Sequence, residues 1–182
     1  LYIIEIGGKM MNIAKIKYCS IGNWKGISTS LYVSGCCHHC QGCFQPKTWN
    51  PNYGDEWNEI DKQMIIDSLS PKHITSLVLL GGEPFMRYNI PELVDLCKEV
   101  RTMYGDSVEL VAFTGFTFEN MLCDPLQMEL LEQLNVLIDG KFEQELYSPK
   151  LNFRGSSNQR IIKVQESLTK GEIVLHELNN EV

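Results

Sequence analysis

Three closely spaced cysteines constrain this chain more than any other feature. They lie in the segment 33–44, VSGCCHHCQGCF, where Cys36, Cys40 and Cys43 form a C-x3-C-x2-C pattern. Thiolates are soft ligands that suit iron–sulfur clusters, and three of them can bind three irons of a [4Fe–4S] cubane. The fourth iron would lack a protein ligand, and an open metal position is typical of a catalytic site. The spacing therefore predicts a metal loop that does chemistry.

The same loop contains further potential ligands, and these leave a zinc site as an alternative. Cys37, His38 and His39 lie between the first two cysteines of the motif. Zinc ligands usually come in spaced pairs, whereas these three are adjacent, so we favour the cluster. We expect Cys37 not to bind iron, and we expect His38 and His39 to be exposed loop residues near the cluster.

Composition limits the classes of protein. The chain has 182 residues, of which 43% are hydrophobic and 21% charged, and this suits one globular domain. A net charge of −7 argues against a nucleic-acid partner. No stretch reaches the roughly 20 apolar residues of a membrane span, and nothing resembles a signal peptide, so we expect a cytoplasmic protein. Cys97 and Cys123 fall in helix-like segments, where we expect buried thiols that act as small hydrophobes.

Alternating hydrophobic segments predict a single α/β domain. Buried or half-buried strands are expected at 27–34, 76–80, 108–113 and 135–138, and helices at about 59–69, 91–105 and 118–131. This alternation is typical of βα units around a parallel sheet. We assign 1–10 to a mis-started or disordered extension, 11–166 to the domain, and 167–182 to a tail. The chain beyond about residue 160 could form a hairpin or an edge strand.

A second motif follows the strand at 76–80. Gly81-Gly82-Glu83-Pro84 would let the backbone approach a ligand closely, and Glu83 could accept a hydrogen bond from a ligand ammonium group. Double glycines also mark ordinary turns, so the motif gains weight only from its place one βα unit after the cysteines.

Together these motifs resemble those of the radical S-adenosylmethionine (SAM) superfamily. Within it, the chain is similar to the activases of anaerobic ribonucleoside-triphosphate reductase, on motifs that run in order from about residue 12 to 161. Besides the two motifs above, these are Thr48-Trp49, Thr114-Gly115-Phe116, Ile138-Asp139-Gly140-Lys141-Phe142 and Arg154-Gly155-Ser156-Ser157-Asn158-Gln159.

The resemblance implies an incomplete, laterally open (β/α) barrel and a radical mechanism. A reduced [4Fe–4S] cluster on Cys36, Cys40 and Cys43 would cleave SAM to methionine and a 5′-deoxyadenosyl radical. That radical would take a hydrogen atom from a glycine of the reductase, leaving a glycyl radical. A flavodoxin-type electron donor is implied, because the reaction needs the low end of the potentials that such clusters reach.

The resemblance also implies a set of SAM-binding residues and no catalytic residue beyond them. Many superfamily members have an aromatic residue before the third cysteine; Gly42 stands there, so Phe44 is the better candidate for the adenine wall. The expected set is Gly42, Cys43, Phe44, Gly81, Gly82, Glu83, Thr114, Asp139 and Lys141. Asp139 and Lys141 could instead order a bound cation or form a turn ion pair. Trp49 is expected to pack, and Arg154 and Asn158 could contact SAM or the reductase.

Two other functions stay open at this point. One is a radical SAM enzyme that acts on a small molecule or on another glycyl-radical enzyme. The 154–159 motif together with Asp139-Gly140-Lys141 argues against it. The other is a non-catalytic metal or electron-carrier module, which would have no use for an open iron beside Gly81-Gly82-Glu83.

Overall fold

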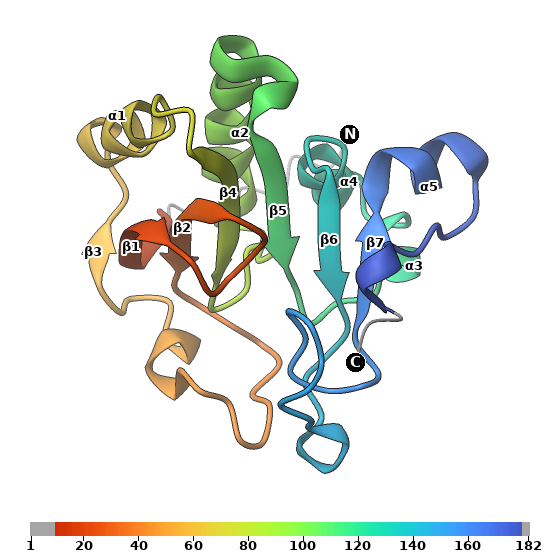
Figure 1. The fold of residues 1–182 in the computed structure, drawn as a ribbon. Coiled ribbons are helices and arrows are strands. Elements are labelled where there is room, and N and C mark those ends of the chain that lie inside the picture. The colour runs from red at the N-terminus through yellow and green to blue at the C-terminus, as the bar shows by residue number, and fades with distance from the viewer. Residues whose placement is uncertain (1–9, 180–182) are drawn as a thin grey trace, which may run out of the picture.

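A seven-stranded sheet forms the centre of the computed structural model, which describes residues 10–179 (Figure 1). The strand order is β3-β1-β2-β4-β5-β6-β7. The strands are β1 (Asn12–Ser20), β2 (Ile27–Val33), β3 (Asp55–Glu56), β4 (Ile74–Gly81), β5 (Glu109–Phe113), β6 (Val136–Asp139) and β7 (Arg160–Lys163). The α-helices are α1 (Glu59–Ser68), α2 (Ile90–Tyr104), α3 (Phe118–Met121), α4 (Pro125–Leu131) and α5 (Val164–Lys170).

The four central strands β2, β4, β5 and β6 are parallel, and an antiparallel strand pairs with this group on each side. Strand β1, with β3 beyond it, flanks β2, and β7 flanks β6. The two outer strands β3 and β7 are not paired with each other, so the sheet stays open laterally. The incomplete α/β barrel expected from the sequence is thereby confirmed.

Local sequence explains where the predicted helices begin. The side chain of Asn58 accepts hydrogen bonds from the backbone N–H groups of Ile60 and Asp61 at the start of α1. Asp124 does the same for α4, and Pro125 occupies the first turn, where its missing N–H costs nothing. Such caps contribute about 1 kcal/mol each. Pro125 thus separates α3 from α4, and Gly105 ends α2, as the sequence indicated.

Both faces of the sheet are apolar, because alternate residues of each strand pack on opposite sides. In β4, Leu77 and Leu79 belong to the larger core beneath the helices, whereas Val78 belongs to a smaller core on the other face. Trp24, which is 1% exposed, fills that smaller core from the β1–β2 connection. Its ring lies 4.9 Å from that of Phe153.

The last part of the chain combines an edge strand with an unpredicted helix. Strand β7 pairs antiparallel with β6, and α5 follows it. The chain then returns to β7, where the N–H of Lys163 donates to the carbonyl of Val174 and the N–H of His176 donates to that of Ile161. The first nine residues of the expected extension lie outside the described part.

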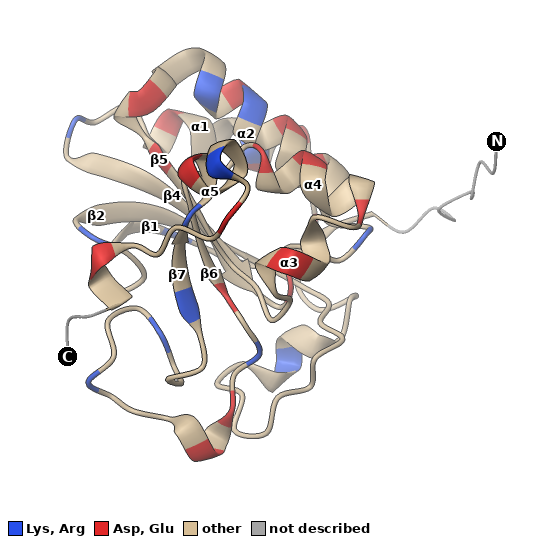
Figure 2. Ribbon diagram, turned by 90° about the vertical axis from the view of Figure 1, so that its right-hand side faces the viewer, with Lys and Arg blue, Asp and Glu red and all other residues tan. Residues whose placement is uncertain are grey.

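Charged residues of both signs are interspersed over the helical layer (Figure 2). In the described part of the chain, no helix has the length and apolar character needed to cross a bilayer.

Candidate active site

The cysteine loop begins where β2 ends, and backbone hydrogen bonds anchor its base to neighbouring segments. The N–H of Ser34 donates to the carbonyl of Asn12 (2.9 Å), and that of Gly35 donates to Thr48 (2.7 Å). The carbonyl of Gly35 accepts from the N–H of Glu83 at 2.7 Å. The loop and the Gly81–Glu83 turn are therefore connected directly, because β2 and β4 are parallel neighbours in register at Val33 and Gly81.

Cys36, Cys40 and Cys43 are free thiols of intermediate exposure that line one pocket. The described residues contain no group of three His, Cys, Asp or Glu side chains arranged to hold a single metal ion. A cubane has a different geometric requirement. Each cysteine binds a different iron, so the three sulfurs need not converge on one point. The three thiols in one pocket therefore fit a cluster.

Backbone N–H groups approach the sulfurs, as expected around an iron–sulfur cluster. The N–H of Gln45 lies 3.4 Å from Cys43 Sγ. Burial raises the pKa of the Cys36 thiol to about 11, and the N–H groups of His38 and His39 oppose this shift. Burial also raises the pKa of Cys40, where the N–H of Phe142 acts in the opposite direction. Binding of iron at these thiols would therefore release protons.

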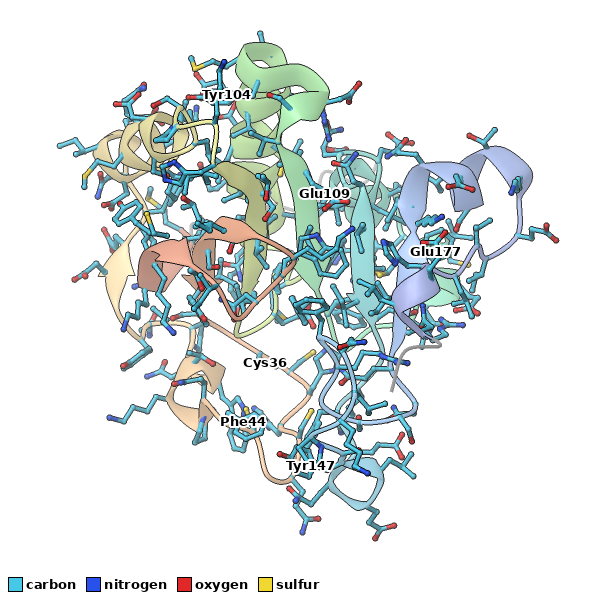
Figure 3. All side chains as sticks on the ribbon, in the orientation of Figure 1. Cys36, Phe44, Tyr104, Glu109, Tyr147 and Glu177 are labelled. Carbon is cyan, nitrogen blue, oxygen red and sulfur yellow. The ribbon has the colours of Figure 1, made fainter. Side chains whose placement is uncertain are left out.

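The pocket has a volume of about 410 Å³, which is within the range of small-molecule sites. It lies at the carboxyl ends of the parallel strands, where α/β folds place their chemistry. Figure 3 shows Cys36, Phe44 and Tyr147 at this end and Tyr104 at the opposite end. Besides the three cysteines, the predicted residues that line it are Phe44, Gly81, Gly82, Glu83 and Thr114.

Glu83 lines the pocket but already has four donors. Its carboxylate accepts hydrogen bonds from Thr114 Oγ1, from the N–H groups of Phe85 and Gly115, and from His38 Nε2. The side chain is 1% exposed. The expectation that His38 is solvent-exposed was wrong, because this hydrogen bond draws its ring in to 12% exposure.

An aromatic group stands at the pocket. Phe44 is 75% exposed, and its ring lies 6.1 Å from Phe142 and 6.5 Å from Tyr147.

Gly42 is not among the lining residues of the pocket. A Cβ at Gly42 would lie 1.5 Å from Gln144 Oε1, and the φ of Gly42 is +75°. The structure therefore gives Gly42 a packing role between two loops, and not the place in the pocket that we expected.

Asp139 and Lys141, both predicted at the SAM site, are not brought to the pocket lining. Asp139 is fully buried and bonded to the guanidinium of Arg160, and it also accepts from the N–H of Phe118. Lys141 is exposed. The ion-pair alternative is thus realised for Asp139, although its partner is Arg160 and not Lys141.

Arg154 and Asn158 make internal contacts that the sequence did not indicate. Arg154 donates to the backbone carbonyl of Asn179 at 3.0 Å and to that of Gln159 at 3.4 Å. Asn158 donates to the carbonyl of Lys141 at 2.8 Å. Both residues thus stabilise the β6–β7 loop, and Arg154 also connects it to the C-terminal segment.

Sequence reasoning missed several pocket residues. Tyr32 lines the pocket together with Asn23, whose amide donates to the Tyr32 hydroxyl at 2.8 Å. The alternation in 27–34, with one polar side, was the signal that could have identified Tyr32. Asn23 lies in an irregular segment and carried no such signal. Trp49 both lines the pocket and packs on His39, with ring centroids 4.8 Å apart.

Two other cysteines show a mixed outcome. Cys97 is buried within α2, as expected, and burial raises its pKa to about 12. Cys123 is exposed, so the expectation of a buried thiol there was wrong. It lies in the turn after the four-residue α3 and not within a helix.

Comparison with known proteins agrees with the site. Residues 23–162 match the model of a family described as a 4Fe-4S single cluster domain. The chain is 36% identical over 155 residues to the anaerobic ribonucleoside-triphosphate reductase-activating protein of Pasteurella multocida, covering 84% of this chain and 98% of that one. It is 35% identical to the phage T4 protein of the same name (83% and 93% covered) and 34% identical to that of Escherichia coli K12 (82% and 96%). The chain therefore belongs to the family of 4Fe–4S anaerobic ribonucleoside-triphosphate reductase-activating proteins.

Proposed function

We propose that this chain is a radical SAM activase that generates a glycyl radical on anaerobic ribonucleoside-triphosphate reductase. The observation that carries the proposal is one pocket lined both by the three cysteines and by the Gly81–Glu83 turn. Family membership agrees with it, because the relatives are named for the activation of that reductase.

Different residues of this pocket would bind the cluster and exclude water. Cys36, Cys40 and Cys43 would hold three irons and leave the fourth open for SAM. When bound and reduced, a cluster held there would supply the electron for reductive cleavage of SAM to methionine and a 5′-deoxyadenosyl radical. Leu80 and Phe113 line the pocket with apolar surface, which excludes water from the reacting groups.

The placement of SAM follows from the pocket lining. We propose that the methionine end lies at the Gly81–Glu83 turn and at Thr114, close to the cysteines. Phe44 would then provide an aromatic face for adenine, supported by Phe142, which also lines the pocket. The open side of the sheet leaves room for a polypeptide substrate, which a closed barrel would exclude.

We also propose a flavodoxin-type electron donor. Cleavage of a sulfonium requires a low potential, at the lower end of the roughly −700 to +450 mV that iron–sulfur clusters span. Cys37 and Gln41 in the cysteine loop are exposed, so a donor protein can approach the cluster from this side.

The deciding experiment is anaerobic reconstitution with iron and sulfide, followed by SAM, dithionite and the reductase. We expect 5′-deoxyadenosine and a doublet glycyl signal in electron paramagnetic resonance (EPR). Deuterium on the reductase glycine α-carbon should appear in the 5′-deoxyadenosine, because that glycine gives up the hydrogen.

A chain with Cys36, Cys40 and Cys43 all changed to alanine is the matched control and should give neither product. SAM cleavage without a radical on the reductase would contradict the proposed substrate. A zinc-loaded, colourless protein would contradict the cluster.

A further inference from the structure

The carboxylate of Glu83 has no free acceptor position. Oε2 accepts from His38 Nε2 at 2.7 Å and from the N–H of Gly115 at 2.8 Å. Oε1 accepts from Thr114 Oγ1 at 2.8 Å and from the N–H of Phe85 at 2.9 Å. A carboxylate offers about four lone-pair positions, so four donors saturate it. Glu83 therefore connects separate segments, and its side chain does not offer the free acceptor for a ligand ammonium group that the sequence led us to expect.

One of the four donors differs from the other three in origin. Phe85, Thr114 and Gly115 belong to the segments that directly follow β4 and β5 and are fixed by the sheet. His38 comes from the cysteine loop, two residues after Cys36 and two before Cys40. The His38–Glu83 hydrogen bond thus links the middle of the metal-binding loop to the ends of two central strands.

The surroundings of His38 are shaped to receive its ring. The imidazole lies edge-on to Phe116, with ring centroids 4.6 Å apart. It also packs on Gly115, where an added Cβ would lie only 2.4 Å from His38 Cδ2. Any residue other than glycine at 115 would thus displace the ring. His39, next to it, is exposed and packs on Trp49.

We infer that His38 is a positioning residue, which holds the cysteine loop at a set distance from the Gly81–Glu83 turn. The inference rests on the proposed function, because that distance decides whether SAM can reach the open iron and the turn at once. His38 lines the pocket, but its Nε2 is bonded to Glu83, through which it acts. Geometry of this kind is demanding, since a displacement of about 1 Å can reduce a rate about 10²-fold.

The test compares three variants of the reconstituted full chain. His38→Ala removes the hydrogen bond, and His38→Gln keeps an amide N–H of nearly the same reach. His39→Asn is the matched control, because it removes the neighbouring ring and asparagine tolerates the φ of +45° found there. The measurements are iron content, the SAM dissociation constant, and the change that SAM causes in the EPR spectrum of the reduced cluster.

We expect His38→Ala to keep its iron, to bind SAM about tenfold more weakly and to cleave it about 10²-fold more slowly at saturation. The EPR change caused by SAM should be reduced in this variant. His38→Gln should recover most of the binding and of the EPR change, and His39→Asn should match the wild type.

Several results would overturn the inference. One is SAM affinity and an EPR response in His38→Ala that equal those of the wild type. Another is loss of iron from a folded His38→Ala chain, which would make His38 a residue that holds the cluster. Should the alanine variant fail to fold, His38→Asn replaces it, because its amide is too short to reach Glu83; wild-type SAM binding by that variant would also overturn the inference. A wild-type chain that fails to cleave SAM would instead contradict the proposed function.

Discussion

Gly82 and Gly35 pack so closely that a Cβ on Gly82 would lie 2.5 Å from the Gly35 carbonyl oxygen. The same atom would lie 2.9 Å from the carbonyl oxygen of Thr48. From the sequence we expected a side chain at Gly82 to enter ligand space. The structure shows that it would press on the base of the cysteine loop instead.

Gly82→Ala should therefore reduce both the iron content and the thermal stability of the chain, in addition to SAM binding. Backbone atoms cannot move aside cheaply, and overpacking costs about 1–3 kcal/mol. Gly22→Ala is the control, because nothing lies within 4 Å of a Cβ at Gly22. Iron content and a thermal melt decide the matter: a Gly82→Ala chain that loses SAM affinity alone would restore the ligand-space interpretation.

Alanine at Cys36, Cys40 or Cys43 should abolish the brown colour and SAM cleavage, because two thiolates hold a cubane poorly. Cys37→Ala should keep both, since Cys37 is exposed and does not line the pocket. Iron and sulfide analysis with the visible spectrum provides the measurement. Equal loss in Cys37→Ala would mean that a different set of cysteines binds the cluster.

Phe44→Ala should weaken SAM binding about tenfold, because stacking of a base on an aromatic ring contributes about 1–3 kcal/mol. Its stability should stay near that of the wild type, since the side chain is 75% exposed. Tyr18→Ala is the control, an exposed aromatic residue of β1 that does not line the pocket. Unchanged SAM affinity by calorimetry would remove Phe44 from the adenine site.

Asp139→Ala should lower the free energy of unfolding by about 2 kcal/mol and leave SAM affinity unchanged. The substitution removes the buried partner of Arg160. The Arg160 guanidinium is partly exposed and still pairs with Glu119, so the loss of stability should be smaller than for a fully buried ion pair. Glu119→Gln, at an exposed position, should cost less than about 1 kcal/mol.

The Arg160–Glu119 pair also gives a pH dependence. Hydrogen bonds from Arg160 lower the pKa of Glu119 from 4.5 to about 2. Its stabilising contribution is therefore present above pH 4.5 and lost as the pH falls towards 2. Urea unfolding at a series of pH values tests this dependence on Glu119.

Urea unfolding combined with SAM titration tests the Asp139→Ala prediction. Weaker SAM binding by Asp139→Ala at unchanged stability would return Asp139 to the SAM site.

The central parallel strands and their helices could be predicted because their hydrophobic patterns are local. Strand β1 was missed, although Lys15-Ile16-Lys17 alternates, because an antiparallel strand beside β2 departs from the βα repeat that we assumed. Helix α5 was missed for a different reason. Its seven residues are too few for a clear helical period.

The cysteines and the Gly81–Glu83 turn could be predicted because the residues of each motif lie close together in the sequence. His38–Glu83 and Asp139–Arg160 were not, because these partners lie 45 and 21 residues apart. Which donor reaches a buried carboxylate depends on how strand ends pack, and no local pattern records that packing.

Trp24 and Phe153 fill the inner face of the half-barrel below the pocket, so the way in lies among the loops that carry the cysteines and Phe142. A reductase segment that reaches the pocket would have to lie over these same loops. The reductase segment, SAM and the products of SAM cleavage would therefore share one entrance. One set of loops would thus serve both the exchange of small molecules and the approach of the protein substrate.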